Sequence, residues 1–71
     1  MTLTISADSE KKYFEVYTKD ERFANAPMAG AGRGYRTFYV PIYKKSWFEQ
    51  LEEIASWVNN ELHEECLFEI F

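Results

Sequence analysis

The spacing of hydrophobic positions changes period along the chain, and the change separates a sheet-forming part from a single helix. Residues 46–62 place apolar side chains three and four positions apart, which is the period of an amphipathic helix. At roughly 100° per residue, one arc of this helix is apolar and the opposite arc carries glutamates. We expect the apolar arc to cover a core. Its members are Trp47, Phe48, Leu51, Ile54, Ala55, Val58 and Leu62.

A capping box marks the start of this helix. Ser46 precedes Glu49 by three residues, so the serine oxygen and the glutamate carboxylate can accept hydrogen bonds from backbone N–H groups that the first turn leaves without partners. The helix is therefore expected to begin directly after Ser46 and to reach Leu62, with His63 at its exit.

Four shorter segments alternate apolar and polar residues with a period of two, as strands do. The segments are 2–7, 12–19, 35–44 and 66–71. Residues 8–11 read as a polar turn, so the first two segments resemble a hairpin. Pro41 lacks an amide hydrogen and belongs on an edge strand or at the final residues of its strand.

These elements predict an α+β fold in a single domain that spans residues 1–71. One amphipathic helix packs on one face of a small sheet of three to four strands, in the order β-β-β-α-β. The right-handed crossover rule places the last strand parallel to the third if both lie in one sheet. A chain of 71 residues is near the size at which one core is only marginally sufficient.

Residues 20–34 interrupt the pattern with a proline and three glycines, and we expect a long flexible loop there. A loop of about 15 residues in so small a domain is usually functional or mobile. Phe23, Met28 or both are expected to hold it to the core. The glycines lead into a strand rather than a helix, which argues against a phosphate-binding loop. Arg22, Arg33 and Arg36 are available to grip acidic groups of a partner.

The net charge of −4 conceals a division of the chain. Residues 1–45 contain all eight Lys and Arg residues and five acids, a balance of +3, whereas residues 46–71 contain seven glutamates and no Lys or Arg, a balance of −7. An acidic surface attracts basic protein surfaces and repels nucleic acid. The alternative is that these glutamates only solvate the outside of the helix.

Composition predicts a folded chain in a reducing compartment. The hydrophobic share of 46% and the aromatic share of 18% exceed what disordered segments carry. Cys66 is the single cysteine, so no internal disulfide can form, which suits the cytoplasm. No apolar stretch approaches the roughly 20 residues that span a bilayer. We expect a cytoplasmic protein without a membrane partner.

The tyrosines share one strand parity. They are opposite in parity to Phe14, Val16, Phe38, Val40 and Ile42, so a helix that covers those residues leaves the tyrosines on the other face of the sheet. An exposed aromatic stripe marks an interaction site, although tyrosine is also ordinary on a solvated sheet face. The five are Tyr13, Tyr17, Tyr35, Tyr39 and Tyr43.

Trp57 lies away from the apolar arc of the helix, beside Glu53 and Glu61. A regular helix leaves it partly exposed, where a tryptophan can anchor a partner. The alternative is that Trp57 covers the rim of the core or packs under the 20–34 loop.

The chain contains no recognisable catalytic or metal-binding set. His63, Glu64, Glu65 and Cys66 lie together, but zinc sites draw ligands from two separated segments, and the sequence has no second histidine or cysteine. A nucleophilic triad needs a preformed pocket, for which so small a domain has little room. We expect a non-enzymatic protein with no metal and no cofactor.

The second half of the chain resembles a known family. The run Tyr39-Val40-Pro41-Ile42-Tyr43, the acidic helix containing Ala55-Ser56-Trp57 and the short terminal strand are similar to the small bacteriophage inhibitors of host RNA polymerase, the gene 2 protein type. The chain differs from that type because its terminal strand lacks arginines. More loosely, it resembles phage proteins that inhibit restriction and CRISPR systems. The resemblance implies a phage-encoded protein that disables a host nucleic-acid enzyme by occupying it.

We therefore expect a small interaction protein that occludes a host protein or protein–nucleic-acid complex and does not itself bind nucleic acid. One alternative is a single-stranded nucleic-acid-binding module that uses the tyrosine face and the Arg/Lys loop. Another is a homodimeric structural module joined through the tyrosine face. The candidate partner-binding residues are Tyr39, Tyr43, Trp57, Glu49, Glu52, Glu53, Glu61, Glu64, Arg33 and Arg36.

Overall fold

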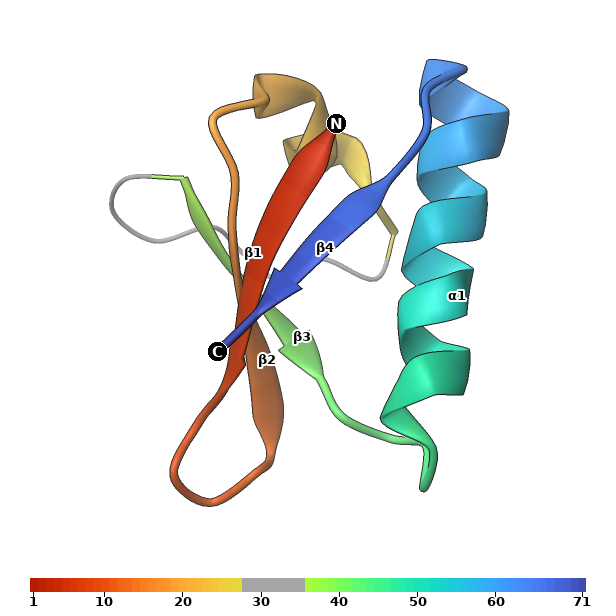
Figure 1. The fold of residues 1–71 in the computed structure, drawn as a ribbon. Helices are drawn as coiled ribbons and strands as arrows, with labels where there is room; N and C mark the ends of the chain where they lie inside the picture. The colour runs from red at the N-terminus through yellow and green to blue at the C-terminus, as the bar shows by residue number, and fades with distance from the viewer. Residues whose placement is uncertain (28–35) are drawn as a thin grey trace.

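The computed structural model describes residues 1–27 and 36–71. These residues form a four-stranded sheet in the order β3-β2-β1-β4, and one long helix covers one of its faces (Figure 1). The predicted α+β fold is confirmed. The strands are β1 at Thr2–Ala7, β2 at Tyr13–Tyr17, β3 at Thr37–Pro41 and β4 at Leu67–Ile70.

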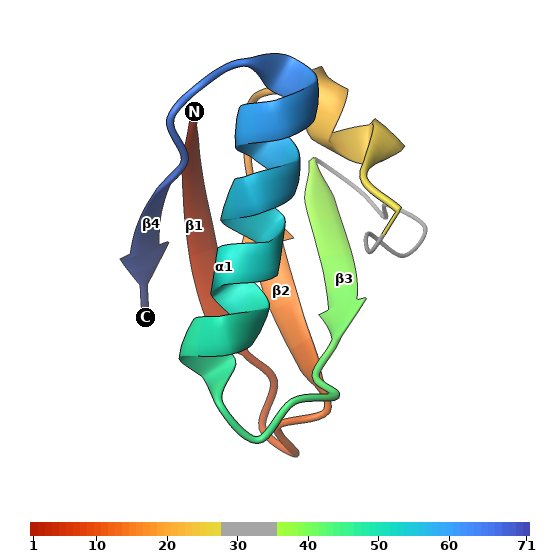
Figure 2. The same cartoon turned by 90° about the vertical axis from the view of Figure 1, so that its right-hand side faces the viewer.

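The sheet is mixed. β1 pairs antiparallel with β2, as the predicted hairpin requires, and β2 pairs antiparallel with β3. β4 pairs parallel with β1 at the other side. Because β3 and β1 point the same way, β4 is also parallel to β3, as the crossover rule predicts. Figure 2 shows the chain passing from β3 through the helix to β4 over one sheet face in the right-handed sense.

The helix spans the predicted residues. It consists of α1 (Trp47–Trp57) and a π-helical last turn, η2 (Val58–Leu62). Ser46 is the N-cap, and its Oγ accepts a hydrogen bond from the backbone N–H of Glu49 at 3.4 Å. His63 ends the helix in the left-handed conformation, with φ 56° and ψ 38°.

The core lies between the sheet and the helix. Alternate residues of β1, β2 and β3 point toward α1, and Leu51, Ile54 and Val58 of the helix close over them. Two members of the predicted apolar arc are exposed, Trp47 at 37% and Phe48 at 71%. The sheet contributes Leu3, Ile5, Phe14, Val16, Phe38 and Val40.

The described part of the predicted 20–34 loop is more ordered than expected. Residues Glu21–Asn25 form a 3-10 helix, η1, whose N-cap Asp20 accepts a hydrogen bond from the backbone N–H of Arg22. Phe23 is fully buried, so it does hold this segment to the core. Met28, the glycines and Arg33 lie outside the described residues.

The third strand is shorter than predicted. β3 ends at Pro41, which is both on an edge strand and at the last position of that strand, as its missing amide hydrogen requires. Residues 42–46 then lead into α1 as a connection rather than as further strand.

Candidate interaction surfaces

Three exposed glutamates of α1 and η2 carry negative charge that is not paired within the described residues. Glu49, Glu52 and Glu61 are all exposed, and none of them makes an ion pair with any residue in the part of the chain that the structure describes. Exposed carboxylates that form no ion pair leave their charge open to solvent and to a partner. The acidic face is therefore defined by Glu49, Glu52 and Glu61.

Glu53 is tied to the connection that precedes the helix. Its carboxylate accepts hydrogen bonds from the Tyr43 hydroxyl and from Lys44 Nζ, the latter at 2.8 Å. The Lys44 ammonium and the Tyr43 hydroxyl lower the pKa of the Glu53 carboxyl. The hydrogen bond to Glu53 raises the pKa of Tyr43. Glu53 is therefore already occupied within the chain and offers a partner less charge than expected.

Glu64 is also occupied within the chain. It forms an ion pair with Arg22 of η1, 42 residues earlier in the sequence. Arg22 binds the Asp20 carboxylate as well, with Nε 2.9 Å from Oδ1, and this contact lowers the pKa of Asp20 to about 2. Glu53 and Glu64, which the sequence analysis counted among the partner-binding glutamates, therefore make contacts within the fold instead.

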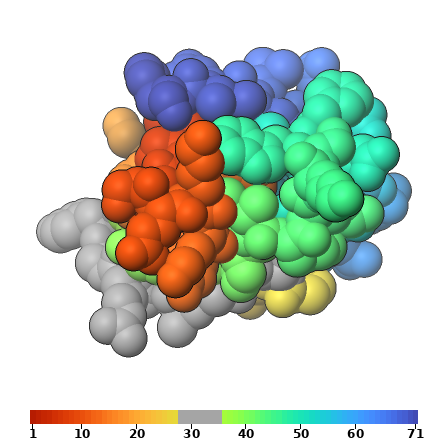
Figure 3. Space-filling view, turned by 90° about the horizontal axis from the view of Figure 1, so that it is seen from below, coloured from red at the N-terminus to blue at the C-terminus, as the bar shows by residue number. Residues whose placement is uncertain are grey.

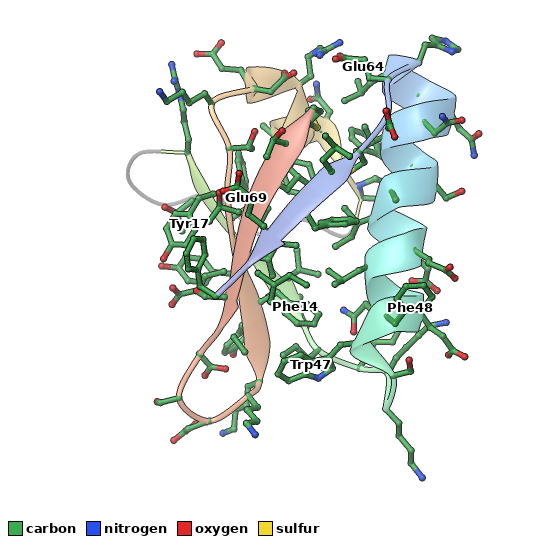
Figure 4. The ribbon with its side chains drawn as sticks, viewed as in Figure 1. Phe14, Tyr17, Trp47, Phe48, Glu64 and Glu69 are labelled. Carbon is green, nitrogen blue, oxygen red and sulfur yellow. The ribbon has the colours of Figure 1, made fainter. Side chains whose placement is uncertain are left out.

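The open face of the sheet carries three of the predicted tyrosines. Tyr13 and Tyr17 are exposed and Tyr39 is half-buried. Figure 4 shows Tyr17 and Glu69 on the side of the sheet away from α1. The Tyr17 hydroxyl donates a hydrogen bond to Glu15 Oε2 at 2.6 Å, which raises the pKa of Tyr17. The predicted parity is thus confirmed for the strand residues.

Tyr43 does not belong to the tyrosine face. It lies beyond the end of β3, and its hydroxyl reaches Glu53 on α1, so it sits on the helix side of the molecule. The prediction failed because it extended strand alternation past Pro41. Tyr35 lies outside the described residues.

A shallow hollow of about 750 Å³ opens on the tyrosine face. Its lining includes Thr4 of β1 and Tyr17 of β2, together with the charged residues Lys19, Asp20, Arg36 and Glu69. Arg36 has a positive φ of 54° and lies 3.9 Å from Glu21 through its guanidinium. Charges of both signs border the hollow, so it has no single electrostatic preference.

Trp57 takes the core-side alternative. Its ring meets Phe23 of η1 edge to face, with 6.2 Å between centroids, and it packs against the core cluster. It therefore joins α1 to η1 and is only half-exposed. Trp57 is a structural contact rather than the free anchor that the regular helix predicted.

A different apolar group is exposed at the start of the helix. Phe48 is 71% exposed, Ile70 is 60% exposed and Phe71 is exposed as well. Trp47 packs edge to face on Phe14, with 5.4 Å between centroids, and keeps part of its ring open (Figure 4). Figure 3 shows the side of the molecule on which both the first turns of α1 and the end of the chain are visible. We define Trp47, Phe48 and Ile70 as the apolar end, because Phe71 has the opposite strand parity to Ile70.

The sequence contains a partial signal for the apolar end. Phe48 lies at the margin of the apolar arc of the helix, and Ile70 has core parity on the last strand. Neither fact shows that the helix fails to cover them, because coverage depends on how the sheet twists beneath α1. That twist is a property of the assembled sheet.

The described residues contain no cluster of three or more His, Cys, Asp and Glu side chains that could hold a metal ion. In the same ranges, no helix is both long and apolar enough to cross a bilayer. Comparison with protein-family models, with curated proteins and with solved structures finds no match for this chain.

Proposed function

We propose that this chain is a small, non-enzymatic, phage-encoded inhibitor that occludes a host nucleic-acid-handling protein. The acidic face, whose glutamates form no ion pair with a described residue, carries the proposal. Proteins that handle nucleic acid present basic clefts, because they neutralise backbone phosphates with Lys and Arg. A rigid helix with exposed carboxylates is complementary to such a cleft.

The apolar end provides exposed apolar surface that could form the desolvated centre of an interface. Protein interfaces join a desolvated apolar centre to a polar rim, and large aromatic side chains commonly act as anchors. Phe48 and Trp47 lie in the first turn of α1, next to Glu49 and one turn before Glu52. Phe48 therefore replaces Trp57 as the proposed aromatic anchor.

Inhibition assays test this proposal directly. The purified chain is added to bacterial RNA polymerase, to a restriction nuclease and to a CRISPR nuclease, and each activity is measured. We expect inhibition of one of them, and we expect it to weaken as salt rises from about 50 mM to about 300 mM, because salt screens contacts between charges. An inhibitor that acts through apolar contacts alone is not expected to weaken as the salt concentration rises.

Charge-reversal variants separate the acidic face from net charge. Glu49→Lys combined with Glu52→Lys should weaken inhibition at least about tenfold. Glu10→Lys combined with Glu21→Lys changes the net charge equally on other elements and should leave inhibition nearly unchanged. No inhibition of any enzyme class, or equal losses from both pairs, would contradict the proposal.

The hollow on the tyrosine face favours a second candidate function. Tyr17 lies beside Lys19 and Arg36 there, and single-stranded nucleic acid binds to sites where rings stack on bases and cations follow the phosphates. A gel shift with single-stranded DNA and RNA distinguishes the two candidates. The inhibitor proposal expects no shift, and a shift abolished by Tyr17→Ala would favour the nucleic-acid-binding module.

A further inference from the structure

The outer edge of β4 has unpaired backbone groups. The backbone N–H of Leu67 donates to Met1 O and that of Phe71 donates to Ile5 O, both at 2.9 Å. In a parallel pair, alternate residues direct both backbone groups toward the neighbouring strand. The N–H and C=O groups of Phe68 and Ile70 therefore point away from β1. No described strand lies beyond β4 to receive them.

An apolar strip runs beside this edge on the helix side of the sheet. Phe68 and Ile70 are paired with Leu3 and Ile5, so their side chains share the core face of the sheet. Phe68 is half-buried against the core, whereas Ile70 is 60% exposed, and Phe48 of α1 is exposed on the same end of the molecule. In Figure 1 the helix and β4 lie closest at the helix C-terminal end and diverge toward the helix start.

We propose that β4 binds an extended basic segment of the partner protein as a fifth strand of the sheet. This inference rests on the proposed function, because it names the segment and the mode by which the inhibited protein is held. Addition of a strand to an exposed sheet edge gives affinity through main-chain hydrogen bonds and specificity through alternate side chains. Here one set of side chains would cover Ile70 and Phe48, and the other would lie beside Glu69.

Charge decides between a basic segment and a second copy of this chain. Residues 46–71, which include both α1 and β4, contain seven glutamates and no Lys or Arg. Two copies joined at β4 would bring Glu69 near its counterpart and set two acidic regions side by side, and like charges across strands are unfavourable. Lys or Arg on an added strand would instead face Glu69 on the open sheet face.

Peptide binding to the whole chain tests the inference. The probe is a short synthetic peptide of alternating valine and lysine, and the control is the same design with glutamate in place of lysine. Binding is measured by NMR, together with hydrogen exchange of the Phe68 and Ile70 amides. We expect the basic peptide alone to bind and to slow exchange at both amides, while Leu67 and Phe71 are already protected by β1.

Two variants address the edge itself. Ile70→Pro removes an outward-facing N–H and spares the bonds to β1, which residues 67 and 71 make, so it should fold and should bind the basic peptide at least about tenfold more weakly. Ile70→Val retains the N–H and should bind nearly as the parent does. Should Ile70→Pro fail to fold, Glu69→Lys serves instead, and its preference should shift toward the acidic peptide.

The outcomes separate this inference from the proposed function. Absence of peptide binding, or binding that Ile70→Pro and Glu69→Lys leave unchanged, would overturn the inference even if the chain inhibits an enzyme. Concentration-dependent protection of Phe68 and Ile70 without peptide, with a dimer in sedimentation, would overturn it in favour of a second copy. Peptide binding with no enzyme inhibited would leave the edge site in place and remove the proposed function.

Discussion

Gln50 shows how one polar side chain closes the connection between the sheet and the helix. It is 1% exposed, and its amide nitrogen donates to Pro41 O at 2.6 Å. Its Oε1 accepts hydrogen bonds from the backbone N–H groups of Tyr43 and Lys44 at 3.2 and 3.4 Å. Buried polar atoms require such partners, and here they also fix where β3 ends and α1 begins.

Gln50→Leu should destabilise the fold by about 2–3 kcal/mol, because a leucine of similar size leaves three backbone groups without their partner. This is a large share of the roughly 4–10 kcal/mol expected for a domain of this size. Urea denaturation followed by circular dichroism measures the loss. Glu52→Ala, on the exposed side of the same helix, is the control and should change stability by less than about 0.5 kcal/mol. A Gln50→Leu protein as stable as its parent would show that these bonds contribute nothing.

Asp20 makes the stability of the fold depend on pH in the acidic range. Arg22 lowers the pKa of the folded Asp20 carboxyl from 3.8 to about 2. The ionised form is therefore favoured by folding, and its contribution is complete above the unfolded value and is lost as pH falls from about 4 to about 2. Asp20→Asn keeps an N-cap but removes the charge.

The melting temperatures of the parent and of Asp20→Asn, measured from pH 2 to pH 6, test this account. The parent should be more stable at pH 6, and the difference between the two should shrink as pH falls toward 2. Other carboxyls titrate in both proteins and cancel in the difference. A gap between the melting temperatures that stays constant over the whole range would contradict the assigned role of Asp20.

At the scale of elements, local pattern was enough to predict most of the fold. The helix boundaries followed from the period of three to four and from Ser46, and the strand faces followed from parity in Leu3, Ile5, Phe14 and Val16. The pattern failed where tertiary contacts decide. Tyr43 leaves its strand because Gln50 holds its backbone on the helix side. The 3-10 helix η1 forms because Asp20 caps its first turn and the buried Phe23 side chain holds it to the core.

The N-cap of α1 is an element-scale feature that can be tested alone. Ser46→Ala should lower stability by about 1 kcal/mol, because the Glu49 N–H loses its acceptor. Ser46→Asp keeps an acceptor at the same position and should retain most of the stability. Urea denaturation of the three proteins measures both effects. If Ser46→Asp loses as much stability as Ser46→Ala, the side-chain oxygen is not what caps the helix.

At the scale of the whole molecule, the candidate site depended on distances that the sequence does not contain. Counting charges predicted an acidic C-terminal third, but only the fold shows that Arg22 and Lys44 neutralise Glu64 and Glu53 and leave the acidic face smaller. The exposed Ile70 was unpredicted for the same reason, because its parity is that of a core residue. Ion pairs between residues distant in the sequence and the twist of the sheet thus decide which side chains are exposed, and local sequence pattern does not predict either.

Besides the sheet and the long helix, the short helix η1 also contributes to the core. Phe23 is 0% exposed and lies between the sheet and the helix, with its ring centroid 5.2 Å from Phe38 and 6.2 Å from Trp57. The short helix η1 thereby joins β3 to α1 at the edge where the sheet would otherwise be open. A segment that resembles a surface loop in the sequence thus contributes Phe23 and Ala26 to the hydrophobic interior.

Phe23→Ala should therefore cost about 3–5 kcal/mol, as removal of a buried aromatic ring usually does. Since that approaches the whole stability of so small a domain, the variant should be largely unfolded at moderate temperature. Phe23→Leu keeps most of the volume and should cost less than about 1.5 kcal/mol. Thermal and urea denaturation measure both variants. If Phe23→Ala lowers the free energy of unfolding by less than about 1 kcal/mol, the Phe23 ring is not an essential part of the core. In that case η1 would contribute little to the stability of the fold.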